Sequence, residues 1–159
     1  GASKVPYPDN ENLVKVTVFN MGGTVTAEGD YLNGIRDGIW TEFYDGGLVK
    51  STAGYVNGQL QGLKIDLDER GRITSRSTFY KGELHGQYVK YNGARIKEFK
   101  EYKNGKLDGL TELFYNDGKL METSTYVNGL RHGKATWYDQ QGNITIEYMY
   151  ENGEWIKDE

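Results

Sequence analysis

The order of apolar and polar positions in this chain repeats with a period of 23 or 24 residues. The repeated phrase is an aromatic residue, two further residues, a glycine, three residues and a second glycine, as in Tyr31-Leu-Asn-Gly34-Ile-Arg-Asp-Gly38. A near-constant period of this length is typical of a repeat architecture, so it predicts the fold before any single residue does. The leading aromatic residues of the copies are Tyr31, Tyr55, Phe79, Tyr102, Tyr126 and Tyr150.

Each repeat contains two extended runs separated by turn signals. In the repeat that starts at Tyr102, residues 110–115 and 119–127 are rich in β-formers, with Asn116-Asp117-Gly118 between them and Asn128-Gly129 after them. Asn-Gly and Asp-Gly pairs between extended runs predict β-hairpins, and no window has helical periodicity. The sequence therefore predicts an all-β fold, an elongated, twisted, single antiparallel β-meander of about twelve short strands.

Two more columns appear when the repeats are aligned on their leading aromatic residues. The offsets between the columns are even, apart from a one-residue deletion in the third repeat, and strand side chains alternate between faces. We therefore predict that all three columns share one buried face, where stacked aromatic residues supply most of the stability. The second column is Phe43, Leu67, Tyr91, Phe114 and Tyr138, and the third is Val25, Val49, Ile73, Ile96, Leu120 and Ile144.

The repeat positions define the expected domain organisation. Residues 1–12 are predicted to be an N-terminal tail, and residues 13–159 the repeat array. The terminal strands of such an array are open edges, which must be blunted or serve as docking sites. The array comprises a half-repeat over 13–30, repeats from 31, 55, 79, 102 and 126, and a C-terminal half-repeat over 150–159.

Composition narrows the classes of function. The 159 residues carry a net charge of −4 without a basic stripe, which disfavours nucleic-acid binding and attraction to an anionic membrane. The chain has no cysteine, which excludes disulfides, thiolate catalysis and cysteine-ligated zinc. No apolar run reaches the roughly 18 residues of a membrane span. The compartment stays open between the bacterial cytoplasm and export with a signal peptide removed.

The repeats resemble the MORN repeat in its bacterial variant form. The start of the unit reads Tyr-x-Asn-Gly here, and the tryptophan common after the first glycine is absent from most copies. The resemblance implies a glycine-rich array of β-hairpins, found in protein scaffolds, membrane-junction proteins, lipid-kinase accessory regions and bacterial antitoxin or immunity proteins. The later pair of the unit appears as Asp37-Gly38, Gln61-Gly62, His85-Gly86, Asp108-Gly109 and His132-Gly133.

The residues that could act in catalysis or metal binding occupy positions of the repeat and do not form an active-site motif. His85 and His132 occupy the same repeat position, two repeats apart, where other copies have Asp or Gln. We therefore predict that they are polar turn residues and not metal ligands. There is no Gly-x-Ser-x-Gly elbow and no glycine-rich loop that precedes a helix. The sequence predicts no catalytic residues, no metal site, no cofactor and no enzyme.

The residues that depart from the repeat are the candidates for function. Pairing the second column with the third places Tyr88 opposite Phe99 and Leu113 opposite Met121, with Phe99 beside Leu113. These four apolar residues would form one lateral row, with Trp137 one strand further along. Such a row is either an exposed contact site or a second core layer. The predicted partner-binding set is Trp40, Tyr88, Phe99, Leu113, Met121 and Trp137.

Two hypotheses of function follow. The first is a non-enzymatic protein-interaction or scaffold module, which among bacterial variants would be an antitoxin or immunity protein that neutralises a toxin. The alternative is a binder of a small polar ligand, a glycan or a lipid headgroup in an aromatic-lined groove. A nucleic-acid partner is excluded from both and a membrane partner is disfavoured. A dimer through an open edge strand stays open.

Overall fold

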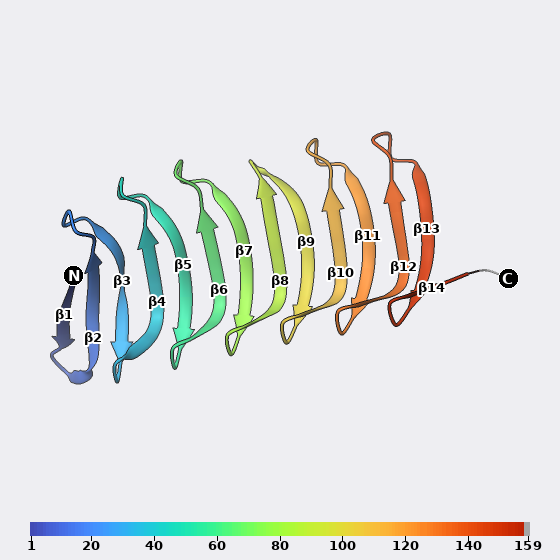
Figure 1. The fold of residues 1–159 in the computed structure, drawn as a ribbon. Helices are drawn as coiled ribbons and strands as arrows, with labels where there is room; N and C mark the ends of the chain where they lie inside the picture. Colours follow the sequence, from blue (N-terminus) through green and yellow to red (C-terminus); the bar gives the residue numbers. More distant parts are fainter. Residues whose placement is uncertain (158–159) are drawn as a thin grey trace. The chain divides into compact units, whose positions relative to one another are not determined.

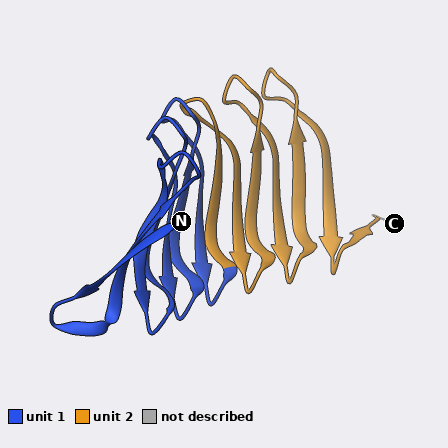
Figure 2. Ribbon diagram, turned by 60° about the vertical axis from the view of Figure 1, so that its left-hand side comes forward, with its two compact units in different colours: residues 1–83 blue, residues 84–159 orange. Residues whose placement is uncertain are grey.

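The computed structural model describes residues 1–157, and all regular structure in this range is β-strand. The fourteen strands of these residues are antiparallel and follow one another in the sheet in chain order (Figure 1). This confirms the predicted all-β antiparallel meander of hairpin repeats, with fourteen strands in place of about twelve. The chain forms two compact units, residues 1–83 and 84–159 (Figure 2).

The first unit contains seven complete strands. They are β1 (Ala2–Tyr7), β2 (Asn10–Phe19), β3 (Val25–Leu32), β4 (Ile35–Phe43), β5 (Val49–Val56), β6 (Gln59–Leu67) and β7 (Ile73–Tyr80). From the unit boundary onward the strands are β8 (Glu83–Asn92), β9 (Arg95–Lys103), β10 (Lys106–Phe114), β11 (Leu120–Val127), β12 (Leu130–Tyr138), β13 (Ile144–Glu151) and β14 (Glu154–Ile156).

The segment predicted as an N-terminal tail contains a strand. Residues 2–7 form β1, which pairs with β2 from Ala2 opposite Val18 to Pro6 opposite Val14. Pro6 fits here because an edge strand tolerates a residue without a backbone N–H. At the other end, residues 158 and 159 of the predicted C-terminal half-repeat lie outside the described residues.

Two-residue turns connect the hairpins at the first glycine of each phrase. Both central residues have positive φ, for example 50° at Asn128 and 82° at Gly129. This is the geometry of a type I′ turn, whose twist matches that of the flanking strands. Asn and Gly adopt it with the least steric cost. The residue before the glycine has φ between 49° and 52° at Asn33, Asn57, Lys81, Asn104, Asn128 and Asn152.

Each turn is hydrogen-bonded to the repeat before it. The amide of Gly129 donates to the carbonyl of Leu107 at 2.7 Å, and the amide of Gly153 donates to that of Arg131 at 2.8 Å. Gly58 makes the same bond to Arg36 at 3.0 Å in the first unit. Because each bond joins a turn glycine to the second residue after the turn glycine of the preceding repeat, the bonds set the register of successive hairpins.

The residue before the second glycine completes this link. Asp108 accepts a hydrogen bond from the backbone N–H of Asn128 at 3.1 Å. His85 accepts one through Nδ1 from Asn104 at 3.2 Å, and His132 accepts one from the next turn at 3.4 Å. A neutral imidazole with an unprotonated Nδ1 provides this acceptor. The two histidines themselves lie in the strands β8 and β12 and not in turns, and their side chains bind the backbone of the following turn.

Two register irregularities in each repeat decide which side chains share a face. In the hairpin of β4 and β5, Trp40 pairs with Ala53 and Glu42 with Ser51, but the next pair is Phe43 with Val49. The extra residue in β5 is a bulge, and one inserted residue reverses the alternation of faces. The second irregularity, near Gly38, inserts two residues and preserves the alternation.

The prediction that all three columns share one face is therefore wrong. Tyr55 pairs with Gly38 and lies on the same face as Trp40 and Ala53, whereas Phe43 and Val49 lie on the other. The same bulge recurs before the second loop of other repeats, for example between Leu113 and Phe114. In each unit we name the side of the leading aromatic residues the aromatic face, and the side of the other two columns the aliphatic face.

The hydrophobic core of the first unit lies on its aromatic face. Val16, Ala27 and Trp40 are buried, and Trp40 is only 2% exposed. The indole ring of Trp40 packs over Gly29 and lies 5.3 Å from the ring of Tyr31, while Nε1 donates to the carbonyl of Asp30 at 2.9 Å. Trp40, predicted as a partner-binding residue, is thus part of the core.

The turn geometry predicts a difference between two substitutions of Asn128. Asn128→Ala should lower the free energy of unfolding by about 1–2 kcal/mol, because an alanine is strained at positive φ. Asn128→Gly should change it little, because glycine adopts this φ freely. Urea unfolding followed by circular dichroism measures both, and an equal loss in the two variants would contradict the proposed role of this turn.

The packing of Trp40 predicts that Gly29 cannot carry a side chain. A Cβ at Gly29 would lie less than 3.0 Å from ring atoms of Trp40. We expect Gly29→Ala to cost about 1–3 kcal/mol through overpacking and to shift the emission of the buried indole. The matched control is Gly46→Ala, because a Cβ there meets no atom within 4 Å and its φ is not positive. Equal thermal stability of the two variants would contradict the packing.

Candidate protein-interaction surface

An aromatic groove lies on the aromatic face of β12 and β13. Trp137 pairs with Ile146, and Ala135 pairs with Tyr148, so all four side chains share this face. The groove has a volume of about 500 Å³. Its lining is Tyr115, Met121, Trp137, Tyr138, Asp139, Thr145, Ile146, Tyr148 and Tyr150.

Small residues on β12 make room for the rings on β13. Gly133 lies opposite Tyr150, and Ala135 lies opposite Tyr148. The ring of Tyr148 therefore contacts three neighbours, edge-on to Trp137 at 5.9 Å and to Tyr150 at 6.4 Å, and tilted against Trp155 at 4.7 Å. Such ring pairs add about 0.5–1.5 kcal/mol each beyond the buried area, so the cluster has a defined shape.

Arg131, near the start of β12, supports this cluster. Its guanidinium lies 5.3 Å from the ring centres of Tyr126 and Trp137 and 5.5 Å from that of Tyr150. These distances are within the range of cation–π attraction. The cation thus joins three aromatic residues of two successive repeats.

Buried acceptors fix the orientation of Arg131. It donates to Oε1 of Glu122 and to Oγ of Ser124, each at 2.8 Å, and the Ser124 hydroxyl donates to the same Glu122 oxygen at 2.9 Å. Glu122 and Ser124 are both buried. Burial also raises the pKa of the Tyr126 hydroxyl above its usual value. The network therefore holds the base of the groove rigid.

A carboxylate borders the groove at the loop between β12 and β13. Asp139 accepts hydrogen bonds from the backbone N–H groups of Gln141 and Asn143, each at 2.9 Å. The bond from Asn143 is the main reason that the pKa of this carboxyl lies below its usual range. Asp139 therefore stays ionised at neutral pH and stabilises the loop.

The first unit also contains an arginine that packs against aromatic rings, but its tryptophan is buried. Arg36 lies 4.3 Å from the ring of Trp40 and 5.3 Å from that of Tyr55, and it donates to the Tyr55 hydroxyl at 3.2 Å. Trp40 follows the leading aromatic residue of its repeat by nine residues, whereas Trp137 follows its own by eleven. Trp40 is therefore buried in the core, whereas Trp137 lines an open groove.

The predicted lateral row does not exist. Tyr88 pairs with Lys100 and not with Phe99, and Phe99 pairs with Val89. Tyr88 lies on the aromatic face with Tyr102, whose ring is 6.2 Å away, while Phe99 lies on the aliphatic face. The error is a register shift of one residue, caused by the bulge between Lys90 and Tyr91.

The predicted pairing of Leu113 with Met121 is wrong for the same reason. Leu113 pairs with Glu122 rather than Met121, because the bulge follows Leu113. On its other side Leu113 pairs with Glu98, while Phe99 pairs with Glu112. Of the predicted set, only Met121 and Trp137 meet in the groove.

The sequence analysis missed several residues of this surface. Tyr148 and Trp155 are both aromatic residues at repeat positions where the other copies have no aromatic residue. Tyr148 stands where Ala53, Ser77 and Ser124 stand in other repeats, two residues before the leading aromatic. A search for residues that depart from the repeat would therefore have found Tyr148 as well. No sequence signal distinguishes Arg131 from other surface cations.

Two stretches of the second unit match a family of known repeats. Residues 107–128 and 131–152 each match the family model described as MORN repeat variant. These two stretches are thus similar to MORN variant repeats, and they contain the residues that line the groove from Tyr115 to Tyr150. None of the curated proteins compared with the chain matches it.

Two further findings concern membranes and metals. Within residues 1–157, no helix is long and apolar enough to cross a membrane. The same described residues contain no group of three or more His, Asp or Glu side chains that could hold a metal ion.

The network beneath the groove predicts a large effect of Arg131. Arg131→Met should lower the free energy of unfolding by about 2–3 kcal/mol, because it leaves the buried carboxylate of Glu122 without its cation. The matched control is Lys134→Met on the same strand, whose ion pair with Glu147 is exposed and should be worth less than about 1 kcal/mol. Equal losses in chemical denaturation would mean that the Glu122 network contributes no more than a surface pair.

Proposed function

We propose that the chain is a non-enzymatic protein-interaction module whose docking surface is the groove of β12 and β13. The observation that carries the proposal is the continuous apolar lining by Met121, Trp137, Ile146 and Tyr148 on one face. Exposed apolar patches mark contact sites, and Met, Trp and Tyr are enriched at the centres of interfaces. Ile146 is 44% exposed and Trp155 is 48% exposed.

The rigid base of the groove supports docking of a protein. Arg131 is held by two hydrogen bonds to buried acceptors and contacts the ring of Trp137. A surface that is already ordered loses less conformational entropy when a partner binds. The groove therefore suits an apolar side chain of a partner, with polar contacts around it such as Asp139.

The finer form of this proposal is a bacterial antitoxin or immunity protein. Its support is the resemblance of the repeats to the bacterial variant arrays. In this form the groove would receive an apolar side chain of a toxin, and binding would block the toxin's activity. Co-expression with the toxin would then rescue growth, and a groove variant would not.

A second candidate is binding of a glycan or a related small polar ligand. The observation that favours it is the set of solvent-accessible rings of Trp137, Tyr148 and Tyr150 along one groove, near the Asp139 carboxylate. Aromatic rings can stack on the apolar face of a sugar. Saturation-transfer NMR with a glycan panel and headgroup-bearing liposomes tests this candidate, and the absence of any signal at millimolar ligand would exclude it.

The interaction proposal predicts loss of a partner when the groove becomes polar. Met121→Ser combined with Ile146→Ser should weaken a defined partner at least tenfold, because both side chains line the groove. The measurement is quantitative capture from an extract of expressing cells, followed by titration of the captured protein. Circular dichroism must confirm that the variant is folded.

The control for this experiment is Leu63→Ser. Leu63 is 49% exposed and lies on the aliphatic face of the first unit, opposite Thr78. This variant should retain the partner with unchanged affinity. A partner that binds the groove variant as tightly as the unmodified chain would contradict the proposal.

A further inference from the structure

A cavity of about 220 Å³ lies on the aromatic face of the first unit. Two rows of side chains that pair across β4, β5 and β6 form it. Because the central strand β5 contributes only Ala53 and Ser51 to these rows, the longer side chains on either side enclose a hollow. Tyr55 follows Ala53 by two residues on β5, so Tyr55 and the adjacent Arg36 close one end. The rows are Trp40, Ala53 and Lys64, and Glu42, Ser51 and Asp66.

The guanidinium of Arg36 is oriented at this cavity but not neutralised. The rings of Trp40 and Tyr55 hold it from two sides, and it donates to the Tyr55 hydroxyl at 3.2 Å. Among residues 1–157 this hydroxyl is the only hydrogen-bond partner of the Arg36 side chain, and no carboxylate forms an ion pair with it. A guanidinium has five N–H donors, so most of them remain for a ligand.

The equivalent arginine of the second unit has its anion built in. Arg36 and Arg131 each follow the leading aromatic residue of their repeat by five residues. Arg131 donates to the buried carboxylate of Glu122 and to the hydroxyl of Ser124, each at 2.8 Å. In the repeat of Arg36 neither acceptor position has a polar side chain, so that repeat supplies no anion. The residues at these two positions are Ala27 and Gly29.

A buried hydroxyl without a partner lines the same cavity. Ser51 is only 9% exposed, and its side chain forms no hydrogen bond with any described residue of the chain. By contrast, the Ser75 hydroxyl donates to Asp66 at 3.0 Å. Buried polar groups of folded proteins are nearly always paired. A bound ligand would provide the partner that Ser51 lacks.

The charge of the lining favours an anion. Three cations and two carboxylates line the cavity, which leaves one positive charge in excess, although the whole chain has a net charge of −4. A carboxylate ligand would balance this excess, whereas a phosphate dianion would bring a second negative charge beside the two carboxylates. The cations are Arg36, Lys50 and Lys64, and the carboxylates are Glu42 and Asp66.

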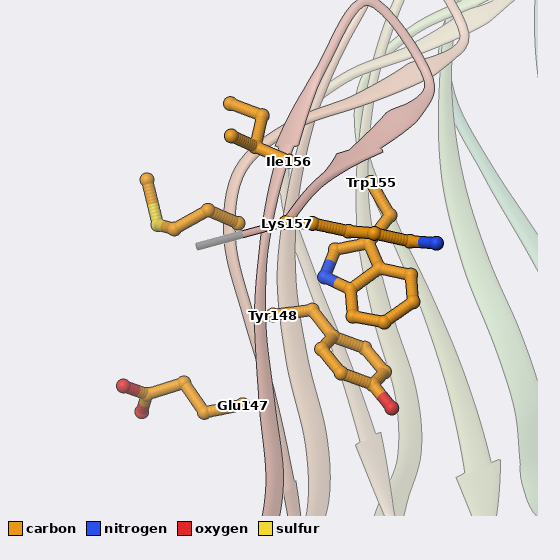
Figure 3. A pocket seen from close by; sticks show the side chains of 6 residues that line it. Glu147, Tyr148, Trp155, Ile156 and Lys157 are labelled. Carbon is orange, nitrogen blue, oxygen red and sulfur yellow. The ribbon is translucent and has the colours of Figure 1, made fainter. Parts of the chain in front are cut away.

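The larger cavity beside β14 lacks these features. It has a volume of about 490 Å³, with Tyr148 and Trp155 projecting to one side and Glu147 and Ile156 to the other (Figure 3). None of its lining residues is buried, and Glu147 already forms an ion pair with Lys134 at 3.0 Å. The unpaired cation and the unpaired buried hydroxyl therefore distinguish the smaller cavity of the first unit.

We propose that the cavity of the first unit binds a small amino or hydroxy acid through its carboxylate group. The two carboxylate oxygens would accept parallel N–H bonds from Arg36, the geometry that a guanidinium favours. Ser51 would supply a further hydrogen bond, and Glu42 would accept one from the amino or hydroxyl group of the ligand. The volume is below that of most sites for drug-sized molecules, which limits the ligand to a small one. The site shares no residue with the groove of β12 and β13, so the inference goes beyond the proposed function.

The test is titration of the full chain with glycine, L-serine and L-lactate, each beside its neutral amide. NMR of the Arg36 Nε–Hε group and of the backbone amides of residues 51–53 measures binding. At least one acid should give saturable shifts at millimolar concentration and bind at least tenfold more tightly than its amide, because the amide lacks the charge that Arg36 pairs with. Absence of saturable shifts with all three acids would overturn the inference, as would equal binding of acids and amides.

Two substitutions in the cavity should weaken this binding. Arg36→Met should do so at least tenfold, because it removes the cation but keeps an unbranched side chain over Trp40. Ser51→Ala should do so about threefold, because it removes only one hydroxyl. The matched control is Arg76→Met, which removes the same charge from the aliphatic face of the first unit, opposite Ile65, and should leave the affinity unchanged.

Circular dichroism checks that each variant is folded. Unchanged affinity in either cavity variant would overturn the inference. A loss in Arg76→Met equal to that in Arg36→Met would show attraction by overall charge alone and overturn it as well.

Inorganic phosphate separates a carboxylate site from a general anion site. Phosphate should bind more weakly than the best of the three acids, because Glu42 and Asp66 repel its second charge. Glu42→Gln should then strengthen the binding of phosphate and weaken that of the acid, since it removes both the repulsion and the acceptor. Phosphate that binds the unmodified chain as tightly as the acid, or a change in the same direction for both ligands, would overturn the inference.

Discussion

The hydrogen bonds between successive Asn-Gly turns are the interaction on which the rest of the structure depends. Each turn presents a glycine amide to a carbonyl one repeat earlier, as between Gly129 and Leu107. The turn can do so because both of its central residues have positive φ, which limits the sequence to Asn-Gly and close substitutes. The repeated phrase thus encodes the link between hairpins more than any single hairpin.

Register has consequences because it assigns side chains to faces. A one-residue bulge in each repeat moves Phe43 and its equivalents away from the leading aromatic residues. The aromatic face then contains the core of the first unit, around Trp40, and the groove of the second, around Trp137. The same scaffold therefore produces a closed core with Gly29 beneath an indole and an open surface where Tyr148 replaces a small residue.

The sequence predicts the period and the hairpins, because these depend on local turn chemistry. It does not predict the bulges, since the extra residue lies within an extended run and carries no distinctive side chain. Tyr88 and Phe99 show the resulting error in the predicted pairing, because a shift of one residue places them on opposite faces. Met121 and Trp137, selected as departures from the repeat, both line the groove, but their companions on β13 depend on the three-dimensional pairing.

The assignment of side chains to the two faces is the central claim, because the groove and the core both follow from it. It is tested most directly by NOE contacts around Tyr88 in the folded chain. We predict contacts from the Tyr88 ring to Tyr102 and to the side chain of Lys100, and none to Phe99. Strong contacts between the rings of Tyr88 and Phe99 would place them on one face and contradict the account.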